Sequence, residues 1–317
     1  MVVAATAVIP QDYRMLALDD KHGDQYGWAV EQAFSFVDTH CHFWDPRKMP
    51  CPWLVEVPPI AGTHTPTQLG AEAGEDMPNQ IVFVQAGSET PLDEVRWVEE
   101  LSQAEPRIAA IVAFAPMDRA AETRAALDVL RRHPLVHGVR HLIQGESDPV
   151  FANRPEFVAG VQRLGEMGLS FDLCIRHHQL PSVTELVRAC PGTSFILDHL
   201  GKPAIRDGQL DPWRPDIARL AELPNVVCKI SGMVAEADPV TWTAAQLAPY
   251  VDAVVRAFGP DRLMFGSDWP VVKIGSGYAP WVRTARALLG SLSSSAQAAI
   301  FNHNARRVYR LADRMAP

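Results

Sequence analysis

Two histidines separated by one residue end an apolar, β-branched segment, in the motif Asp38-Thr39-His40-Cys41-His42. Side chains two residues apart on a strand point to the same side. Both imidazoles can therefore face one site, where they would bind a divalent metal or donate hydrogen bonds to one carbonyl oxygen. Two surface histidines in a loop are the alternative interpretation.

A third histidine and an aspartate end two later apolar segments. His199 stands in DHLG, directly after the apolar run FIL, and Asp268 stands in FGSDWP. An aspartate at the same site could bind metal or accept a proton from an attacking water. The competing interpretations are a hydrogen-bonded core histidine and a turn or helix-capping aspartate. We favour one shared site built from His40, His42, His199 and Asp268.

Further polar and aromatic residues follow other apolar segments, where they could bind a substrate carboxylate or hydroxyl. The candidates are Arg140, His141, Arg176, His177, His178, Lys202 and Lys229. Trp44, Trp53 and Trp269 could stack on a sugar ring, although a packing role fits each equally well. The sequence has no GxSxG nucleophile elbow and no P-loop, which disfavours serine-based and nucleotide chemistry.

Eight short segments are nearly continuous in apolar residues, a pattern typical of parallel strands covered on both faces. They are residues 34–42, 81–87, 108–117, 136–144, 169–175, 193–201, 225–232 and 262–270. Segments with helical spacing lie between them, at 92–105, 156–167, 180–190, 213–223 and 240–258, and residues 293–311 read as a final helix that closes the ring.

Eight strands alternating with helices predict a (β/α)8 TIM barrel of the α/β class. A doubly wound open sheet is the competitor, but no GxGxxG follows the first strand. The candidate residues lie at the C-terminal ends of the strand segments, and active sites of this fold occur at that face. We therefore expect one barrel domain over residues 34–317, preceded by an extension over residues 1–33.

The composition is that of an ordinary globular protein, with 47% hydrophobic and 21% charged residues among 317. The net charge of −8 disfavours nucleic acid as a partner. No apolar run is long enough to span a membrane, and the first residues lack the features of a secretory signal. Five cysteines without a CxxC pair fit reduced thiols better than a disulfide framework. We expect a soluble, cytoplasmic protein.

The motifs DTHCHFWD, GVRHLIQ, LDHLGKP, VVCKISG and RLMFGSDWP occur in this order and together resemble the amidohydrolase superfamily. More narrowly, the chain resembles the branch that holds sugar-acid lactonases (L-fuconolactonase and L-rhamnonolactonase types) and pyrone-dicarboxylate lactonase. The resemblance implies a distorted TIM barrel that hydrolyses a lactone, a cyclic ester. It also implies that Asp268 activates water as the general base, and that His40, His42 and His199 polarise the lactone carbonyl directly or through a metal.

The resemblance leaves the metal and the substrate open. One divalent ion such as Zn²⁺ could bind His40, His42, His199 and Asp268, yet lactonases of this branch resemble enzymes in which a metal is dispensable. The pair His177-His178 departs from the sugar lactonases, and it could supply a further metal ligand or recognise an anionic substrate group. The alternatives are a lactonase for a carboxylated or sulfonated muconolactone or pyrone from aromatic degradation, and a zinc-dependent decarboxylase. The expected partner is a small lactone, and assembly into a homo-oligomer is compatible with the sequence.

Overall fold

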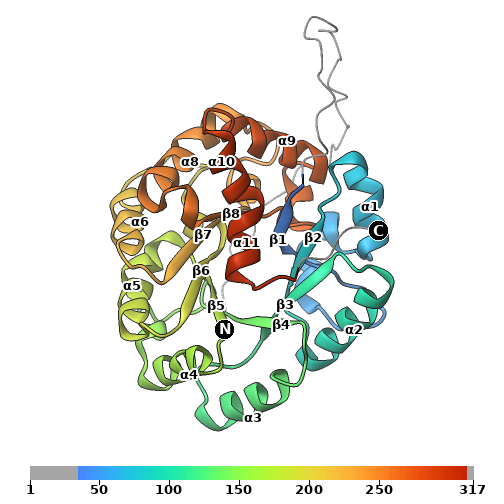
Figure 1. Ribbon diagram of the computed structural model, residues 1–317, viewed down its shortest axis with the longest axis vertical. Coiled ribbons are helices and arrows are strands. Elements are labelled where there is room, and N and C mark those ends of the chain that lie inside the picture. Colours follow the sequence, from blue (N-terminus) through green and yellow to red (C-terminus); the bar gives the residue numbers. More distant parts are fainter. Residues whose placement is uncertain (1–34, 313–317) are drawn as a thin grey trace, which may run out of the picture. The chain divides into compact units, whose positions relative to one another are not determined.

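A computed structural model describes residues 35–312 of the chain, in which eight parallel strands form one sheet in sequential order (Figure 1). The strands are β1 Val37–Cys41, β2 Gln80–Val84, β3 Ile108–Phe114, β4 Val136–Leu142, β5 Ser170–Cys174, β6 Ser194–Leu197, β7 Val226–Ile230 and β8 Leu263–Phe265. A parallel bridge between Cys41 and Trp269 joins the two ends of the sheet. The predicted TIM barrel and its eight strands are confirmed.

Helices follow the strands and surround the barrel (Figure 1). They are α1 Pro66–Ala73, α2 Pro91–Ala104, α3 Ala120–Leu130, α4 Pro155–Glu166, α5 Leu180–Ala189, α6 Trp213–Ala221, α7 Met233–Glu236, α8 Ala244–Phe258, α9 Tyr278–Leu288, α10 Ser294–Ala298 and α11 Asn304–Val308. Apolar residues at helical spacing drive this packing: α4, for example, buries Phe157, Val161 and Leu164. The helices expected over 92–105, 156–167, 180–190 and 213–223 are confirmed within two residues at each end.

The segment expected to be helical over 240–258 forms helix only from Ala244. The Asp238 carboxylate accepts the backbone N–H groups of Val240 and Thr241, which fixes a turn there instead. Thr243 then caps the helix, because its hydroxyl accepts the N–H of Gln246.

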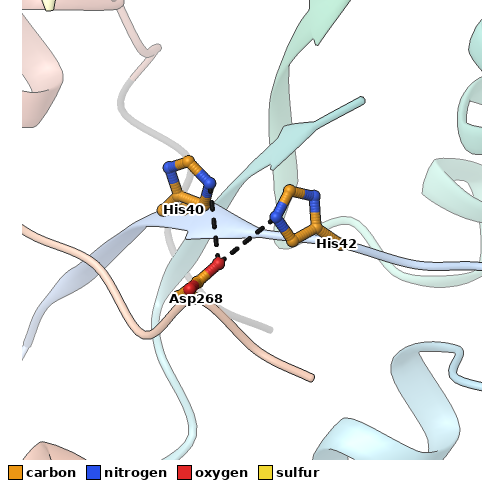
Figure 2. Close-up of side chains that lie close together, drawn as sticks. All are labelled: His40, His42 and Asp268. Carbon is orange, nitrogen blue, oxygen red and sulfur yellow. Dashed lines mark ion pairs between the residues drawn. The ribbon is translucent and has the colours of Figure 1, made fainter. Parts of the chain in front are cut away.

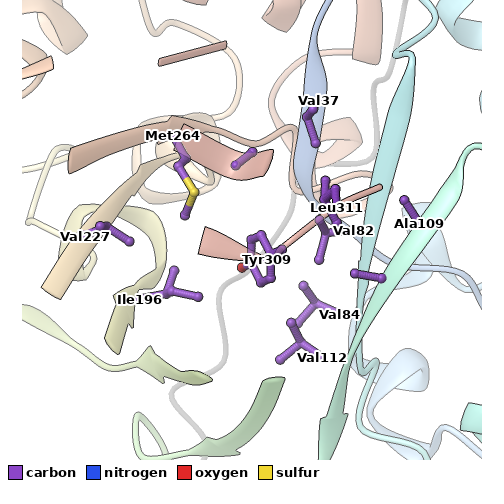
Figure 3. Close-up of a cluster of buried hydrophobic side chains, with 12 residues drawn as sticks. Val37, Val82, Val84, Ala109, Val112, Ile196, Val227, Met264, Tyr309 and Leu311 are labelled. Carbon is purple, nitrogen blue, oxygen red and sulfur yellow. The ribbon is translucent and has the colours of Figure 1, made fainter. Parts of the chain in front are cut away.

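The N-terminal half of the barrel interior is filled by apolar side chains (Figure 3). They include Val82, Ile196, Val227 and Met264 from four different strands. Tyr309, which follows α11, is fully buried among them.

The final segment, expected to be one helix over residues 293–311, is not one regular helix. The π-helical turn Ala299–His303 joins α10 to α11 and packs on β8 and β1, and the chain beyond α11 seals the interior.

Short 3-10 helices follow β1, at η1 Pro52–Glu56 and η2 Pro58–Ile60, and another follows β8, at η8 Val271–Ile274. They stand at the C-terminal end of the barrel, beside the candidate site. No helix within residues 35–312 has the length and apolar character needed to cross a membrane. The predicted N-terminal extension, residues 1–33, lies outside the described residues.

Candidate active site

His40, His42 and His199 converge on the Asp268 carboxylate at the C-terminal end of the barrel. Figure 2 shows the first two rings on either side of that carboxylate. Asp268 Oδ1 lies 3.3 Å from Nε2 of His42, 3.7 Å from Nε2 of His40 and 3.9 Å from Nε2 of His199. The structure thus brings together the four residues that the sequence placed in one site.

The junction between β1 and β8 positions the aspartate. The Asp268 N–H donates to the His40 carbonyl at 2.8 Å, and the His42 N–H donates to the Trp269 carbonyl at 2.7 Å. Asp268 itself has a φ of 60°, in the left-handed region. Non-glycine residues in that region are uncommon and gather at functional sites. This turn aims the carboxylate across the end of β1, toward the histidines.

The position of His199 also depends on an unusual backbone conformation. The chain leaves β6 at Leu197, and His199 takes a φ of 54°. Its Nδ1 lies 2.9 Å from the Ser231 hydroxyl. A β-carbon on Gly232 would stand only 2.5 Å from the same Nδ1, so the ring needs a glycine beneath it. Ser231 and Gly232 therefore fix the position of the His199 ring, the first through its hydroxyl and the second by leaving room for the ring.

The hydrogen bond of His42 fixes its tautomer. Nδ1 lies 2.7 Å from the Val84 carbonyl oxygen, which can only accept, so Nδ1 carries the proton. In the neutral ring Nε2 is then an unprotonated acceptor that faces another acceptor, Asp268 Oδ1. Two acceptors 3.3 Å apart require a proton, a water or a cation beside them. This pair is therefore suited to holding a polarised water.

A buried ion network lies beneath the histidines. The ammonium of Lys229 is 2.6 Å from Asp172 Oδ2 and 3.0 Å from Asp198 Oδ1. Arg140 reaches the other oxygen of Asp198 at 3.3 Å. Two cations thus balance two carboxylates inside the barrel, in place of the apolar filling of its lower half. Removing one partner would leave a buried charge uncompensated, which is strongly destabilising.

The protonation states follow from burial and from the neighbouring charges. Burial lowers the pKa of His199 to about 4 and the pKa of His40 well below its usual value, so both rings are neutral near pH 7. Burial alone would raise the pKa of Asp268, but the contacts with His199, His42 and His40 bring it well below its usual value. Asp268 is therefore an ionised carboxylate beside the neutral imidazoles of His40 and His199.

A cavity of about 440 Å³ opens over this cluster. On its polar side lie His42, His199, Asp268, Arg140, Gln144 and Lys202. On its apolar side lie Trp44, Trp53, Val57, Ile60, Val271 and Ile274, most of which come from η1, η2, η8 and their flanks. One face of a ligand would thus meet hydrogen-bonding groups and the other an apolar wall.

The structure divides the residues that the sequence suggested for substrate binding. Arg140 and Trp44 line the cavity. Trp269 is fully buried, and its indole N–H donates to Glu72. Lys229 lies one layer below, under His40. The geometry gives neither of these two a place in the cavity wall.

Three further histidines lie outside the cavity. His141 follows Arg140 on β4 and so points to the opposite face, where its ring packs against Phe151 and Phe157. His177 Nδ1 lies 3.1 Å from the Lys202 carbonyl, in a separate pocket of about 290 Å³. His178 is exposed.

Sequence reasoning missed Asp172, Asp198 and Ser231. Asp172 had a signal, since a carboxylate inside the apolar run LSFDLCI must find a buried partner if that run is a strand. Asp198 and Ser231 gave a weaker signal, because each simply precedes a residue, His199 or Gly232, that shapes the site. Their roles depend on which side chains lie across the barrel.

Two groups of side chains have donors close enough to share a metal ion: His40, His42 and Asp268, and His40, Asp198 and His199. Imidazole and carboxylate suit Zn²⁺ by type. The arrangement nonetheless does not fit an ion as it stands. Arg140 Nη1 lies 3.3 Å from Nε2 of His40, and Lys229 Nζ lies 3.2 Å from Nδ1. Both ring nitrogens of His40, the ligand that the two groups share, therefore already face a cationic side chain, which leaves no free position for a metal ion.

The amidohydrolase family model matches residues 37–311, and the chain belongs to this family. An L-fucono-1,5-lactonase from Burkholderia multivorans is 33% identical over 293 residues, with 87% of this chain and 96% of the relative covered. An L-rhamnono-gamma-lactonase from Scheffersomyces stipitis is 28% identical, with 64% of this chain and 69% of the relative covered.

Solved structures agree with this assignment. An amidohydrolase from Burkholderia multivorans with bound zinc has a TM-score of 0.79 and 30% identity, with 88% of this chain and all of that chain covered. The fold of the family is thus the fold seen here. The resemblance to the sugar-acid lactonase branch, inferred from the sequence motifs, is confirmed by these relatives.

Proposed function

We propose that this enzyme hydrolyses the lactone of a sugar acid, with Asp268 as the general base. The observation that carries the proposal is the Asp268 carboxylate, which lines the cavity beside His42 and the neutral ring of His199. The two named lactonases among the relatives support the same reaction class.

The chemistry follows from the positions of His42 and Asp268. A water beside them gives one proton to the Asp268 carboxylate as its oxygen attacks the lactone carbonyl carbon. The carbonyl oxygen becomes an oxyanion. When the oxyanion collapses, the bond between the carbonyl carbon and the ring oxygen breaks, and Asp268 returns its proton to that ring oxygen. The product is a hydroxy acid, which ionises and releases one proton to solvent.

His199 is the proposed histidine donor to the carbonyl. If the Ser231 hydroxyl donates to Nδ1, the neutral ring carries its proton on Nε2, which faces the cavity. Donors preorganised for the oxyanion commonly give the largest single contribution to catalysis. His42 orients the attacking water instead of the carbonyl, because its Nε2 accepts a hydrogen bond from that water.

The cavity supports a substrate with one polar and one apolar face. A sugar lactone presents hydroxyl groups to donors and acceptors such as Gln144 and Lys202 while its C–H face meets an apolar wall. Trp53, half-buried on that wall, has its indole N–H fixed on the Ala86 carbonyl, which holds the ring in place.

The test is a proton-release assay with a pH indicator, on a panel of aldonolactones that includes L-fucono- and L-rhamnonolactones, and on carboxylated lactones. Each assay is run with and without a chelator, because zinc is bound in the Burkholderia structure. We expect turnover of at least one aldonolactone, unchanged by chelator, and a kcat at least about 10²-fold lower in Asp268→Asn. Activity confined to carboxylated lactones would replace the proposed substrate class, and activity lost with chelator would replace the proposed mechanism.

A further inference from the structure

Metal binding at this barrel mouth would depend on one residue. Both groups with metal-compatible spacing among residues 35–312 contain His40. Without that ring, neither group keeps three ligands. The surroundings of His40 therefore decide whether an ion can bind.

His40 lies between two cationic side chains. Arg140 Nη1 is 3.3 Å from Nε2, and Lys229 Nζ is 3.2 Å from Nδ1. The Asp198 carboxylate also lies 3.2 Å from Nδ1, whereas Asp268 is 3.7 Å from Nε2. The nearer carboxylate favours the ring proton on Nδ1, which leaves the lone pair of Nε2 for Arg140. A ring nitrogen has a single lone pair, so Arg140 and a metal compete for it.

Arg140 is held firmly in this position. Nη1 also donates to Asp198 Oδ2 at 3.3 Å, and Nη2 donates to the Gln85 carbonyl at 2.6 Å. Within residues 35–312, the Nε–H and the second N–H of Nη2 have no hydrogen-bond partner, and the side chain lines the cavity over Asp268. The guanidinium thus keeps donors for a ligand.

We propose that Arg140 is the resident cation of this site: it occupies the lone pair of His40 that a metal would use, and it donates to the developing oxyanion. The second part rests on the proposed lactone hydrolysis. The first part concerns ion binding alone and can be tested whatever the substrate.

The first experiment measures Zn²⁺ binding by calorimetry on chelator-stripped protein. Arg140→Met frees the lone pair of His40, so we expect it to bind one Zn²⁺ at least about 10-fold more tightly than the wild type. Arg176→Met, which removes an exposed arginine outside the cavity, should bind like the wild type. Adding His40→Asn to Arg140→Met should abolish the gain. Equal Zn²⁺ affinity in Arg140→Met and wild type, or a gain that persists without His40, would overturn the competition.

The second experiment uses Arg140→Lys, which keeps the charge and so protects folding, but cannot reach His40, Asp198 and Gln85 together. With chelator present, we expect kcat to fall about 10²-fold, the usual scale for a lost oxyanion donor, while KM changes less than about threefold. An unchanged kcat would remove Arg140 from the catalytic step. A wild type without lactonase activity would instead refute the proposed function, and the Zn²⁺ comparison would still decide the competition.

Discussion

The His199 ring lies against the α-carbon of Gly232, so that a β-carbon there would stand 2.5 Å from Nδ1. Gly232 also has a φ of 63°, which L-residues rarely adopt. The loop after β7 therefore shapes the site through the absence of a side chain.

Gly232→Ala should displace His199 and strain the backbone. We expect kcat/KM to fall at least about 10-fold and the free energy of unfolding to fall by about 1–3 kcal/mol. Lactone hydrolysis and urea unfolding measure the two effects. Gly192→Ala is the control, because no atom lies within 4 Å of its added β-carbon. Full activity in Gly232→Ala would show that the position of His199 is not critical.

Asp268→Asn keeps the shape of the side chain but removes its ability to take a proton. We expect kcat to fall about 10²-fold or more, the usual scale for a general base. The control is Glu185→Gln, an exposed carboxylate on α5 that pairs with Arg188. Near-normal turnover by Asp268→Asn in the proton-release assay would assign the base to another group.

Glu94, at the start of α2, gives a pH-dependent prediction. It is buried and accepts the Ala86 N–H, and burial raises the pKa of its carboxyl to about 7 from an ordinary value of 4.5. Between these values the folded chain keeps a proton that the unfolded chain loses. The free energy of unfolding should therefore decrease as pH rises through that window.

Glu94→Gln keeps the hydrogen-bond acceptor and removes the titration. We compare the free energy of unfolding of the variant with that of the wild type at each pH. The difference, variant minus wild type, should be larger at about pH 8 than at about pH 5 by on the order of 1–3 kcal/mol. Urea unfolding at the two pH values measures this difference. The same difference at both values would place the pKa of Glu94 near its ordinary range.

The double variant His177→Ala, His178→Ala tests the role that the sequence suggested for these residues. His178 is exposed, and the His177 ring lies beside the Lys202 carbonyl, outside the cavity over Asp268. We expect kcat/KM for a neutral aldonolactone to stay within about threefold of wild type, as for other surface changes. A loss confined to anionic lactones would show that the neighbouring pocket binds their charged group.

Strand periodicity explains which parts of the site were predictable. Apolar runs between helical segments determined the eight strands, and the fold places functional side chains at the strand ends. That reasoning located His40, His42, His199 and Asp268. It treated Arg140 and His141 alike, although adjacent residues of one strand point to opposite faces, and only Arg140 faces the cavity.

The sequence by itself determined the barrel and the four residues at its mouth, because hydrophobic periodicity and motif order are local properties of the chain. Only the tertiary structure decided what surrounds them. Lys229, a candidate ligand for substrate, lies beneath His40 and bonds to Asp172 and Asp198. Arg140 reaches the same histidine from β4, 100 residues away in the chain. The chemistry of His40 depends on these distant charges, since an interaction across the barrel leaves no pattern along it.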